Sequence, residues 1–239
     1  MALGQPLIRL AGVRFAYVPD RPVLDGVELS LGAGERVALL GANGSGKTTL
    51  LHVIVGLLHP QAGHVEAFGR PRRAEGDFHE VRRRAGLLFQ DPEDQLFCPT
   101  VIEDVAFGPI NLGLTQSEAL AVASQTLSAL ALGGYEDRIT YKLSGGEKRL
   151  VSLAAVLAMK PDVLLLDEPT GNLDARARGR LIEILADRQE GMLLVTHDLD
   201  MVRALTKRTA VLAGGTVRAD GATEELLADT ALLDAHGLR

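Results

Sequence analysis

The sequence is poor in cysteine and in aromatic residues. It has a single cysteine, Cys98, no tryptophan, and only 4% aromatic residues. One cysteine cannot form an intramolecular disulfide, so the chain fits a reducing compartment and is not a disulfide-stapled secreted domain. The N-terminal segment MALGQPLIRL also lacks the long apolar run of a signal peptide. We therefore expect an intracellular chain.

Long hydrophobic runs and an excess of positive charge are missing as well. Apolar stretches such as Val151–Met159 fall well short of the roughly 18 residues that suggest a membrane-spanning helix. Lys and Arg total 25 against 31 for Asp and Glu, which gives a formal net charge of −6. This balance argues against nucleic acid or anionic lipid as the main partner. We expect no membrane span of its own, so that any membrane role comes through a partner.

The apolar pattern predicts an α/β fold. Leu7–Tyr17 and Val27–Leu31 are short, alternating or β-branched, and predict strands near the N-terminus. Unbroken apolar runs, typical of a parallel sheet buried on both faces, occupy residues 36–40, 87–90, 163–166 and 192–196. Between residue 91 and about residue 159 the pattern becomes helical, with Thr115 and Glu118 forming a capping box. This predicts a helical insertion between the second and third of these runs.

Three further elements are predicted from local patterns. Thr48–Leu58 is helix-like, and Gly214 with Gly215 predicts the turn of a β-hairpin. The segment Thr223–Ala235 predicts one amphipathic helix close to the end of the chain.

A glycine-rich loop follows the apolar run 36–40. Its sequence from Gly41 to Thr48, GANGSGKT, fits the pattern G-x-x-x-x-G-K-[ST], between a predicted strand and a predicted helix. Glycines let the backbone wrap a phosphate chain, and the amides at the start of the helix point at the anion. Lys47 supplies charge for the β- and γ-phosphates, and Thr48 can ligate Mg²⁺. The predicted ATP-binding residues here are Gly41, Asn43, Gly44, Ser45, Gly46, Lys47, Thr48 and Thr49.

Two adjacent carboxylates, Asp167 and Glu168, end the apolar run 163–166. Neighbouring side chains on a strand point in opposite directions, so they need different roles. Asp167 suits the Mg²⁺ shell, and Glu168, just beyond the strand, suits polarising the attacking water. His197 and Gln90 also follow apolar runs, where a histidine can donate to a phosphate or hold the catalytic carboxylate.

The segment Leu143–Glu147 reads LSGGE and predicts a helix start. Ser144 with Glu147 is a capping box, and a helix start with free amides favours negative charge. Capping alone does not explain Gly145 and Gly146, because a helix former there would be more stable.

In this order, the phosphate loop, Gln90, the LSGGE segment, Asp167–Glu168, Asp174 and His197 resemble the ATP-binding-cassette (ABC) ATPase family over nearly the whole chain. The resemblance implies a P-loop NTPase (RecA-like) core with an N-terminal antiparallel β subdomain and an inserted α-helical subdomain. It implies one domain over residues 1–239, in which 1–90 and 160–239 form the nucleotide-binding core and 91–159 the helical subdomain.

The resemblance also implies a nucleotide sandwich. Two subunits meet head to tail, and Ser144, Gly145 and Gly146 of one contact the γ-phosphate bound by the other. Tyr17 resembles the aromatic residue that stacks on adenine, although it could be an ordinary strand aromatic. Gln90 would touch Mg²⁺ and the water, so that Thr48, Gln90 and Asp167 surround the metal ion while Glu168, His197, Gln90 and Lys47 act in catalysis.

Two features bear on the subtype. Pro169–Asp174 reads PTGNLD, a form common among ATPases of lipoprotein and macrolide exporters, and Glu147 stands where Gln is commonest. The segment after Gln90 instead resembles ATPases of energy-coupling-factor (ECF) importers, most of all the cobalt/nickel branch. Within it, Leu96 and Phe97 are apolar residues that either pack into the helical insertion or present a surface to a partner's helix.

The importer resemblance implies a peripheral subunit at the cytoplasmic face of the cell membrane. Its partners would be a second ATPase subunit, identical or different, a transmembrane scaffold and a substrate-binding membrane subunit. The six histidines (52, 59, 64, 79, 197 and 236) and Cys98 show no close ligand pattern, so cobalt or nickel would be bound by a membrane subunit.

Three alternatives stay open. They are an exporter ATPase, a soluble ABC ATPase for DNA repair, ribosome work or iron–sulfur assembly, and a non-enzymatic regulatory subunit. The presence of Lys47, Asp167, Glu168 and His197 argues against the last.

Overall fold

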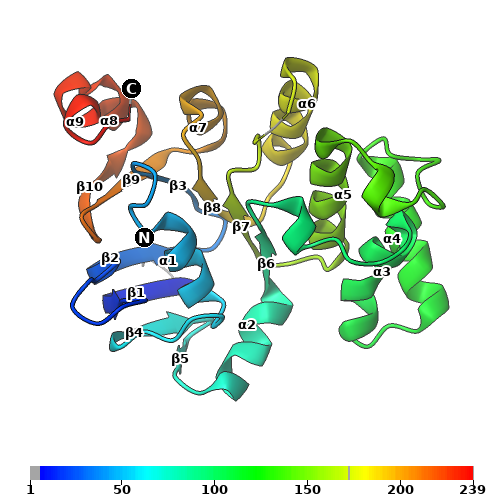
Figure 1. Ribbon diagram of the computed structural model, residues 1–239, viewed down its shortest axis with the longest axis horizontal. Helices are drawn as coiled ribbons and strands as arrows, with labels where there is room; N and C mark the ends of the chain where they lie inside the picture. Colours follow the sequence, from blue (N-terminus) through cyan, green and yellow to red (C-terminus); the bar gives the residue numbers. More distant parts are fainter. Residues whose placement is uncertain (1–5, 172, 239) are drawn as a thin grey trace.

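Two β-sheets organise the chain in the computed structural model, which describes residues 6–171 and 173–238 (Figure 1). The smaller sheet has the order β2-β1-β4-β5 and is antiparallel. Its strands are β1 Ile8–Phe15, β2 Leu24–Leu31, β4 Ala62–Ala67 and β5 Arg70–Arg72. The larger sheet has the order β10-β9-β3-β8-β7-β6. Its strands are β3 Arg36–Leu40, β6 Ala85–Leu88, β7 Val163–Asp167, β8 Gly191–Val195, β9 Arg208–Ala213 and β10 Thr216–Ala222.

The larger sheet is parallel except for its edge strand β10, which pairs antiparallel with β9 through the predicted hairpin. The register pairs Leu39 with Val195, Asp167 with Val195, and Leu88 with Leu166. The carboxyl ends of β3, β8, β7 and β6 therefore meet at one edge of the sheet. In an open α/β sheet this edge is where ligands bind.

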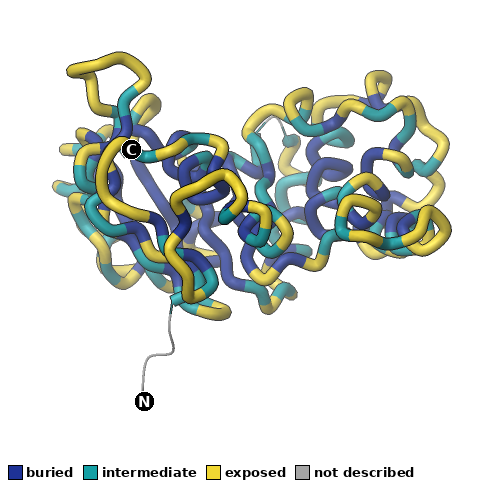
Figure 2. Tube along the Cα trace, turned by 90° about the horizontal axis from the view of Figure 1, so that it is seen from below, coloured by how far each residue is buried: buried dark blue, intermediate teal, exposed yellow. Residues whose placement is uncertain are grey.

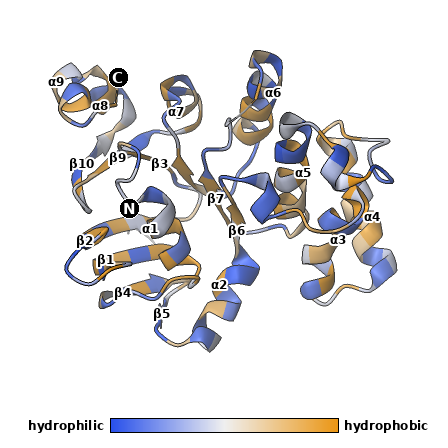
Figure 3. Cartoon of the chain, in the orientation of Figure 1, coloured by the Kyte–Doolittle hydropathy of each residue, from blue (hydrophilic) through white to orange (hydrophobic). Residues whose placement is uncertain are grey.

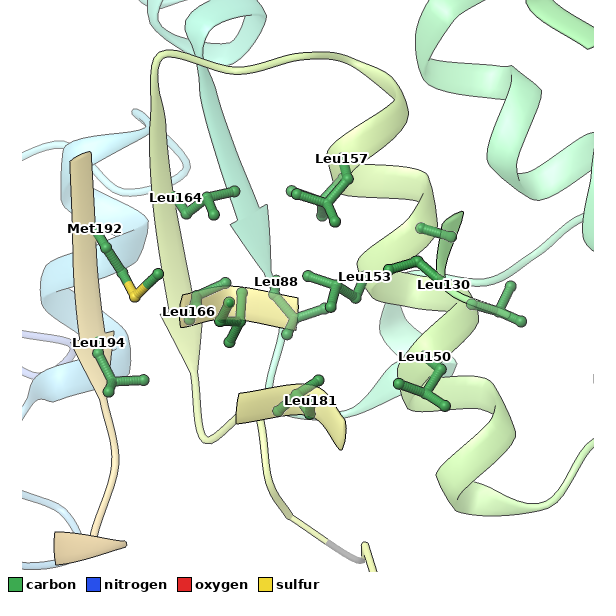
Figure 4. Close-up of a cluster of buried hydrophobic side chains, with 14 of the residues drawn as sticks. Leu88, Leu130, Leu150, Leu153, Leu157, Leu164, Leu166, Leu181, Met192 and Leu194 are labelled. Atoms are coloured by element: carbon green, nitrogen blue, oxygen red, sulfur yellow. The ribbon is translucent and has the colours of Figure 1, made fainter. Parts of the chain in front are cut away.

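Side chains alternate between the two faces of this sheet, so both faces are buried. Val37 and Leu39 of β3 belong to a core shared with the smaller sheet and helix α1, whereas Ala38 and Leu40 belong to a core under the other helices. Figure 4 shows the second core, where leucines of β7 face leucines of α5. The central strands are the most apolar segments of the chain (Figure 3), and buried positions concentrate in them (Figure 2). The predicted doubly buried parallel sheet is confirmed.

Nine α-helices occur in the described ranges 6–171 and 173–238. Their bounds are α1 Lys47–Ile54, α2 Phe78–Arg84, α3 Val101–Asn111, α4 Gln116–Ala129, α5 Gly145–Ala158, α6 Ala175–Ala186, α7 Leu199–Leu205, α8 Thr223–Ala228 and α9 Thr230–Ala235. Helices α3, α4 and α5 contact one another and lie to one side of the sheets, between β6 and β7 in sequence (Figure 1). The helical insertion is therefore confirmed, while the residue limits given for each part stay a prediction. In the described part of the chain, no helix is both long and apolar enough to cross a bilayer.

Two predicted helices have the wrong extent. The helix predicted over Thr48–Leu58 is α1 and ends at Ile54, because Gly56 adopts φ +73° and the amide of Leu57 bonds to the carbonyl of His52 at 2.9 Å. This is a left-handed helix stop of the kind glycine favours. A Cβ on Gly56 would also meet the Phe78 ring at 2.2 Å.

The single helix predicted over Thr223–Ala235 is two helices, α8 and α9. Asp229 leaves the helical conformation with ψ 86°, and its carboxylate accepts a bond from the amide of Leu232 at 2.9 Å. An aspartate at such a position caps a new helix rather than continuing the old one.

Candidate active site

A cavity of about 360 Å³ lies at the carboxyl edge of the larger sheet. Its lining comes from the loop after β3, the ends of β6 and β7, and the segment after β1. The lining residues are Tyr17, Val23, Asn43, Gly44, Gly46, Lys47, Thr48, Thr49, Gln90, Asp167 and Glu168. The structure thus brings together residues predicted from four separate motifs.

The loop from Gly41 to Gly46 needs its glycines for steric reasons. A Cβ on Gly41 would lie 2.4 Å from the carbonyl oxygen of Leu212. Gly46 has φ +102°, and a Cβ there would lie 2.9 Å from the carbonyl oxygen of Val23. The loop therefore packs tightly against its surroundings and presents backbone amides at the start of α1.

Lys47 lies inside the curve of this loop. Its ammonium donates to the carbonyls of Gly41 at 2.7 Å and Ala42 at 3.0 Å. Burial lowers the pKa of Lys47, while Glu168 and Asp167 act in the opposite direction. A cation held in a glycine loop beside two carboxylates can bind a phosphate chain together with a metal ion.

Asp167 is buried at the end of β7, with 2% of its surface exposed. Burial raises the pKa of its carboxyl group, and a hydrogen bond from Thr48 lowers it. Within the described residues, its Oδ1 atom has no hydrogen-bond partner. A buried carboxylate oxygen without a partner is costly, and a divalent cation beside Thr48 would satisfy it. The oxygen donors at this point fit Mg²⁺, which prefers hard oxygen ligands.

Glu168 is held in a strained conformation with φ 44°, an uncommon value for a residue with a side chain. Its amide bonds to the carbonyl of Val195 at 2.8 Å. Its Oε2 atom lies 2.9 Å from Nδ1 of His197 and accepts from the hydroxyl of Thr196 at 3.2 Å. The strand ends of β7 and β8 thus fix this carboxylate at the mouth of the cavity.

A second cavity of about 530 Å³ adjoins the first and shares Asn43, Gln90 and Glu168 with it. His197 also lines this cavity, and its side chain is 80% exposed. Arg149, Gly237 and Leu238 also line this cavity, and they were not among the site residues predicted from the sequence. Arg149 lies two positions after Glu147, within the helix that the LSGGE segment predicts, so this was the signal that could have drawn attention to it. Nothing local identified Gly237 and Leu238, because only the packing of α9 places them here.

Ser144, Gly145 and Gly146 line neither cavity. The capping box is confirmed, since Ser144 donates to Glu147 Oε2 at 2.8 Å and the Glu147 amide bonds back to Ser144 at 3.3 Å. A Cβ on Gly145 would meet nothing within 4 Å, and one on Gly146 would only touch Leu173. Contacts within the described chain therefore do not explain these two glycines.

Tyr17 is 60% exposed at the rim of the first cavity. Its hydroxyl lies 3.2 Å from that of Thr49, and its ring meets Phe15 edge-on, with centroids 4.9 Å apart. The exposed ring at the rim of the cavity is suited to stack on a planar ligand.

Leu96 and Phe97 differ in burial, so packing into the core is confirmed for Leu96 alone, and docking of a partner's helix on Phe97 stays a prediction. Leu96 is buried in the core under the helices. Phe97 is 65% exposed, and its ring meets Phe107 of α3 edge-on, with centroids 4.8 Å apart. These two rings line an apolar groove of about 290 Å³ between the large sheet and the helical insertion.

Comparison with known proteins identifies the family. The model of the ABC transporter family matches residues 24–171, which is more than half of the chain. The chain belongs to the ABC transporter ATPase family. It therefore binds ATP, and it is an enzyme that hydrolyses it. The predicted family and fold class are confirmed.

Curated relatives cover most of this ATPase. A protein of Brucella suis biovar 1 (strain 1330), whose name assigns it only provisionally as an ABC transporter ATP-binding protein, is 56% identical over 88% of this chain and 87% of its own length. The cobalt import ATP-binding protein CbiO of Rhodobacter capsulatus is 44% identical over 98% of this chain and 85% of its own length. The energy-coupling factor transporter ATP-binding protein EcfA of Methanothermobacter thermautotrophicus is 39% identical over 98% of this chain and 76% of its own length.

Solved structures show the same fold. The structure of cbiO1 from Clostridium perfringens, described as part of the ABC transporter complex cbiONQ, has a TM-score of 0.83 at 30% identity, covering 98% of this chain and 95% of that one. The dimeric cassette MJ0796 in a post-hydrolysis state with ADP and Pi has a TM-score of 0.82 at 26% identity, covering 90% and 98%.

Replacing Tyr17 by Ala is expected to weaken ATP binding about 2- to 12-fold, because the loss of one stacking ring costs roughly 0.5–1.5 kcal/mol. Tyr17→Phe keeps the ring and loses only the contact to Thr49, so its affinity should stay within about 2-fold of wild type. Fluorescent ATP titration measures both. Equal affinity of Tyr17→Ala and wild type would contradict stacking.

Cys98 provides a probe of the segment after Gln90. Burial, and then the nearby Asp104, raise the pKa of its thiol to about 11. Because a raised pKa leaves less thiolate, maleimide labelling at pH 8 should be roughly 100-fold slower than for a free thiol. The same chain unfolded in urea is the control and should label at the free rate. Fast labelling of the folded chain would mean that this segment is open.

Proposed function

We propose that this ATPase powers an ECF-type importer of cobalt or nickel, as a dimer bound to membrane subunits at the cytoplasmic face. The observation that carries the proposal is the apolar groove with exposed Phe97, a residue of the segment after Gln90. The names of the CbiO and EcfA relatives and the cbiONQ description of the structural neighbour support this subtype.

The groove has the composition of a docking site for a partner's helix. It is lined by Leu87 of β6 and Phe89 just beyond that strand, by Phe107 of α3, and by Met159, which caps α5. Exposed apolar side chains grouped in this way mark an interaction surface. Asp104 holds Phe97 at the rim of the groove. Its carboxylate accepts a hydrogen bond from the amide of Phe97 at 3.0 Å and another from the hydroxyl of Thr140 at 2.9 Å.

In the ATP site we assign separate roles to the residues. Thr48, Gln90 and Asp167 would hold Mg²⁺, which when bound would neutralise charge on the phosphates. The phosphate loop and Lys47 bind the phosphate chain. Glu168 accepts a proton from the attacking water, and His197 keeps the carboxylate oriented through the 2.9 Å contact.

The site is completed by a second subunit. Ser144 and Gly145 are exposed and Gly146 is half-buried at the start of α5, whose free amides and dipole favour a phosphate. No contact in the described chain requires these glycines, so we assign them to a partner's ATP in a head-to-tail dimer. Each of the two sites would then contain residues of both subunits.

An exporter ATPase is the second candidate, and PTGNLD is the feature that favours it. Asn172 of this segment lies outside the described residues, but Asp174 caps α6 through a 2.8 Å bond from the amide of Ala177. That bond explains the aspartate without reference to the direction of transport. The groove and the names of the relatives favour the importer.

Uptake of labelled Co²⁺ and Ni²⁺ tests the proposal directly. Cells that express the complete transporter should accumulate one of these ions, and omission of this ATPase should abolish the uptake. Copurification in mild detergent gives an independent answer, because either an ECF scaffold or an exporter permease will accompany the chain. An exporter permease, or uptake that does not depend on the ATPase, would refute the proposal.

Phe97→Ala is expected to weaken association with the membrane partner at least 10-fold, because an aromatic anchor in an apolar groove commonly contributes about 2 kcal/mol. ATP binding should not change. Ile110→Ala is a matched control, since Ile110 is an exposed apolar residue of α3 that does not line the groove. Copurification of both variants with the scaffold measures the effect, and equal recovery would exclude the groove.

A further inference from the structure

Arg149 is the largest buried side chain whose role the ATPase mechanism leaves open. It lies in α5 about one turn beyond the helix start, and only 1% of its surface is exposed. Burying a guanidinium is costly unless it is paired or hydrogen-bonded. A charged residue at this depth therefore needs a specific set of partners.

Its partners are the two residues that follow strand β6, Phe89 and Gln90. One guanidinium nitrogen donates to the carbonyl of Phe89 at 2.6 Å, and the other donates to the carbonyl of Gln90. The planar fork of arginine is suited to grip two neighbouring acceptors at once, which a lysine ammonium does less well. Arg149 thus fixes the backbone orientation at Gln90, and with it the direction of the Gln90 side chain.

The Arg149 guanidinium also lies close to the carboxylates of the proposed catalytic site. Arg149 lines the same cavity as Gln90, Glu168 and His197. A Cβ on Gly171, in the turn after Glu168, would lie 3.6 Å from its guanidinium. Asp167, Asp91 and Glu168 provide the negative charge that compensates the buried cation. Its Nε atom has no partner among the described residues.

Helix α5 holds the rest of this segment at two other points. The Gln95 side chain donates to the carbonyl of Ser152 at 3.0 Å and accepts from the amide of Phe89 at 3.3 Å. Lys148 pairs with Glu93. Helix α5, which begins after Ser144, therefore also sets the position of residues 89–95.

We infer that Arg149 is a positioning residue, which fixes Gln90 in the ATP site of its own subunit and links it rigidly to the helix that Ser144 begins. This rests on the proposed role of Gln90. If nucleotide bound by the partner subunit displaces the start of α5, Arg149 would transmit this movement to Gln90 in the ATP site of its own subunit.

A double-mutant cycle of Arg149→Met with Gln90→Ala tests the inference in the full chain. We expect kcat to fall about 10-fold in each single variant, with the dissociation constant for ATP within about 2-fold of wild type, because the phosphate loop is untouched. If Arg149 acts through Gln90, the double variant should match Gln90→Ala. If the two losses of kcat instead multiply in the double variant, Arg149 acts independently of Gln90 and only supports the fold. That result would overturn the inference.

Hydrogen exchange of the peptide around residues 88–95 supplies a readout apart from activity. Arg149→Met should exchange faster there, whereas the control Lys207→Met, at an exposed lysine outside this segment, should leave the peptide as protected as in wild type. Unchanged exchange in Arg149→Met would overturn the inference. If that variant does not fold, Arg149→Lys keeps the charge without the fork, and wild-type kcat in it would overturn the inference equally.

The proposed function can fail separately. Full activity of Gln90→Ala would refute the role of Gln90 itself. An impaired Gln90→Ala beside a fully active Arg149→Met would refute only the inference about Arg149. The uptake experiment depends on neither variant.

Discussion

Replacing Glu168 by Gln is expected to lower ATP hydrolysis at least 100-fold while ATP binding stays intact. An amide cannot accept the proton of the attacking water, and loss of a general base commonly costs about 10²–10⁴ in rate. The substitution keeps the shape of the side chain, so the strained backbone at φ 44° and the bond from Thr196 can persist. Phosphate release and nucleotide titration measure the two effects.

Because Glu168→Gln binds ATP without consuming it, we also expect the variant to accumulate as a closed dimer during gel filtration with ATP. Glu224→Gln is the control, since Glu224 is an exposed carboxylate at the start of α8, and it should behave as wild type. Wild-type turnover in Glu168→Gln would exclude Glu168 as the base.

Ser144→Arg is expected to abolish hydrolysis while each subunit still binds nucleotide. The position is exposed, so a long side chain can fit in the isolated subunit, but it would occupy the space that a partner's phosphate needs. Thr115→Arg is the matched control because Thr115 caps α4 through the same kind of capping box. The control carries the cost of a lost cap, about 1 kcal/mol, without the effect on catalysis.

Mixing two inactive variants distinguishes a shared site from a site within one chain. Lys47→Ala removes the phosphate-binding cation, and Ser144→Arg blocks the contact to the partner. In a mixed head-to-tail dimer, one site keeps Lys47 from one subunit and Ser144 from the other, so the mixture should regain measurable ATPase activity. If Ser144 acted within its own chain, the mixture would stay inactive, and steady inactivity at all ratios would therefore contradict the composite site.

Much of the core could be predicted because its signals are local. The run from Arg36 to Leu40 is a strand at those very limits, and the capping boxes of Thr115 and Ser144 begin helices as predicted. Strands β4 and β5 and helix α2 were not predicted. Strand β4, AGHVEA, is half exposed and has weak apolar alternation, so pairing with β1 decides its conformation.

The groove shows where local reasoning stops. Leu96 and Phe97 are adjacent and equally apolar, so the sequence could not separate them. The turn fixed by Asp104 directs one into the core and leaves the other exposed. The same limit applied to the helix predicted to continue through Gly56, where the ring of Phe78 from a distant segment occupies the space a side chain would need.

The sequence by itself determined that this chain binds phosphate, because the whole phosphate-loop pattern lies in consecutive residues, Gly41–Thr48, between a predicted strand and a predicted helix. Tertiary structure decided the rest of the site. The parallel register of β3, β8, β7 and β6 brings Lys47, His197, Asp167 and Gln90 to one edge, although they are far apart in the chain. It also placed Arg149 against Gln90 and kept Ser144 away from both cavities. Such contacts depend on how buried faces pack, which no local pattern specifies.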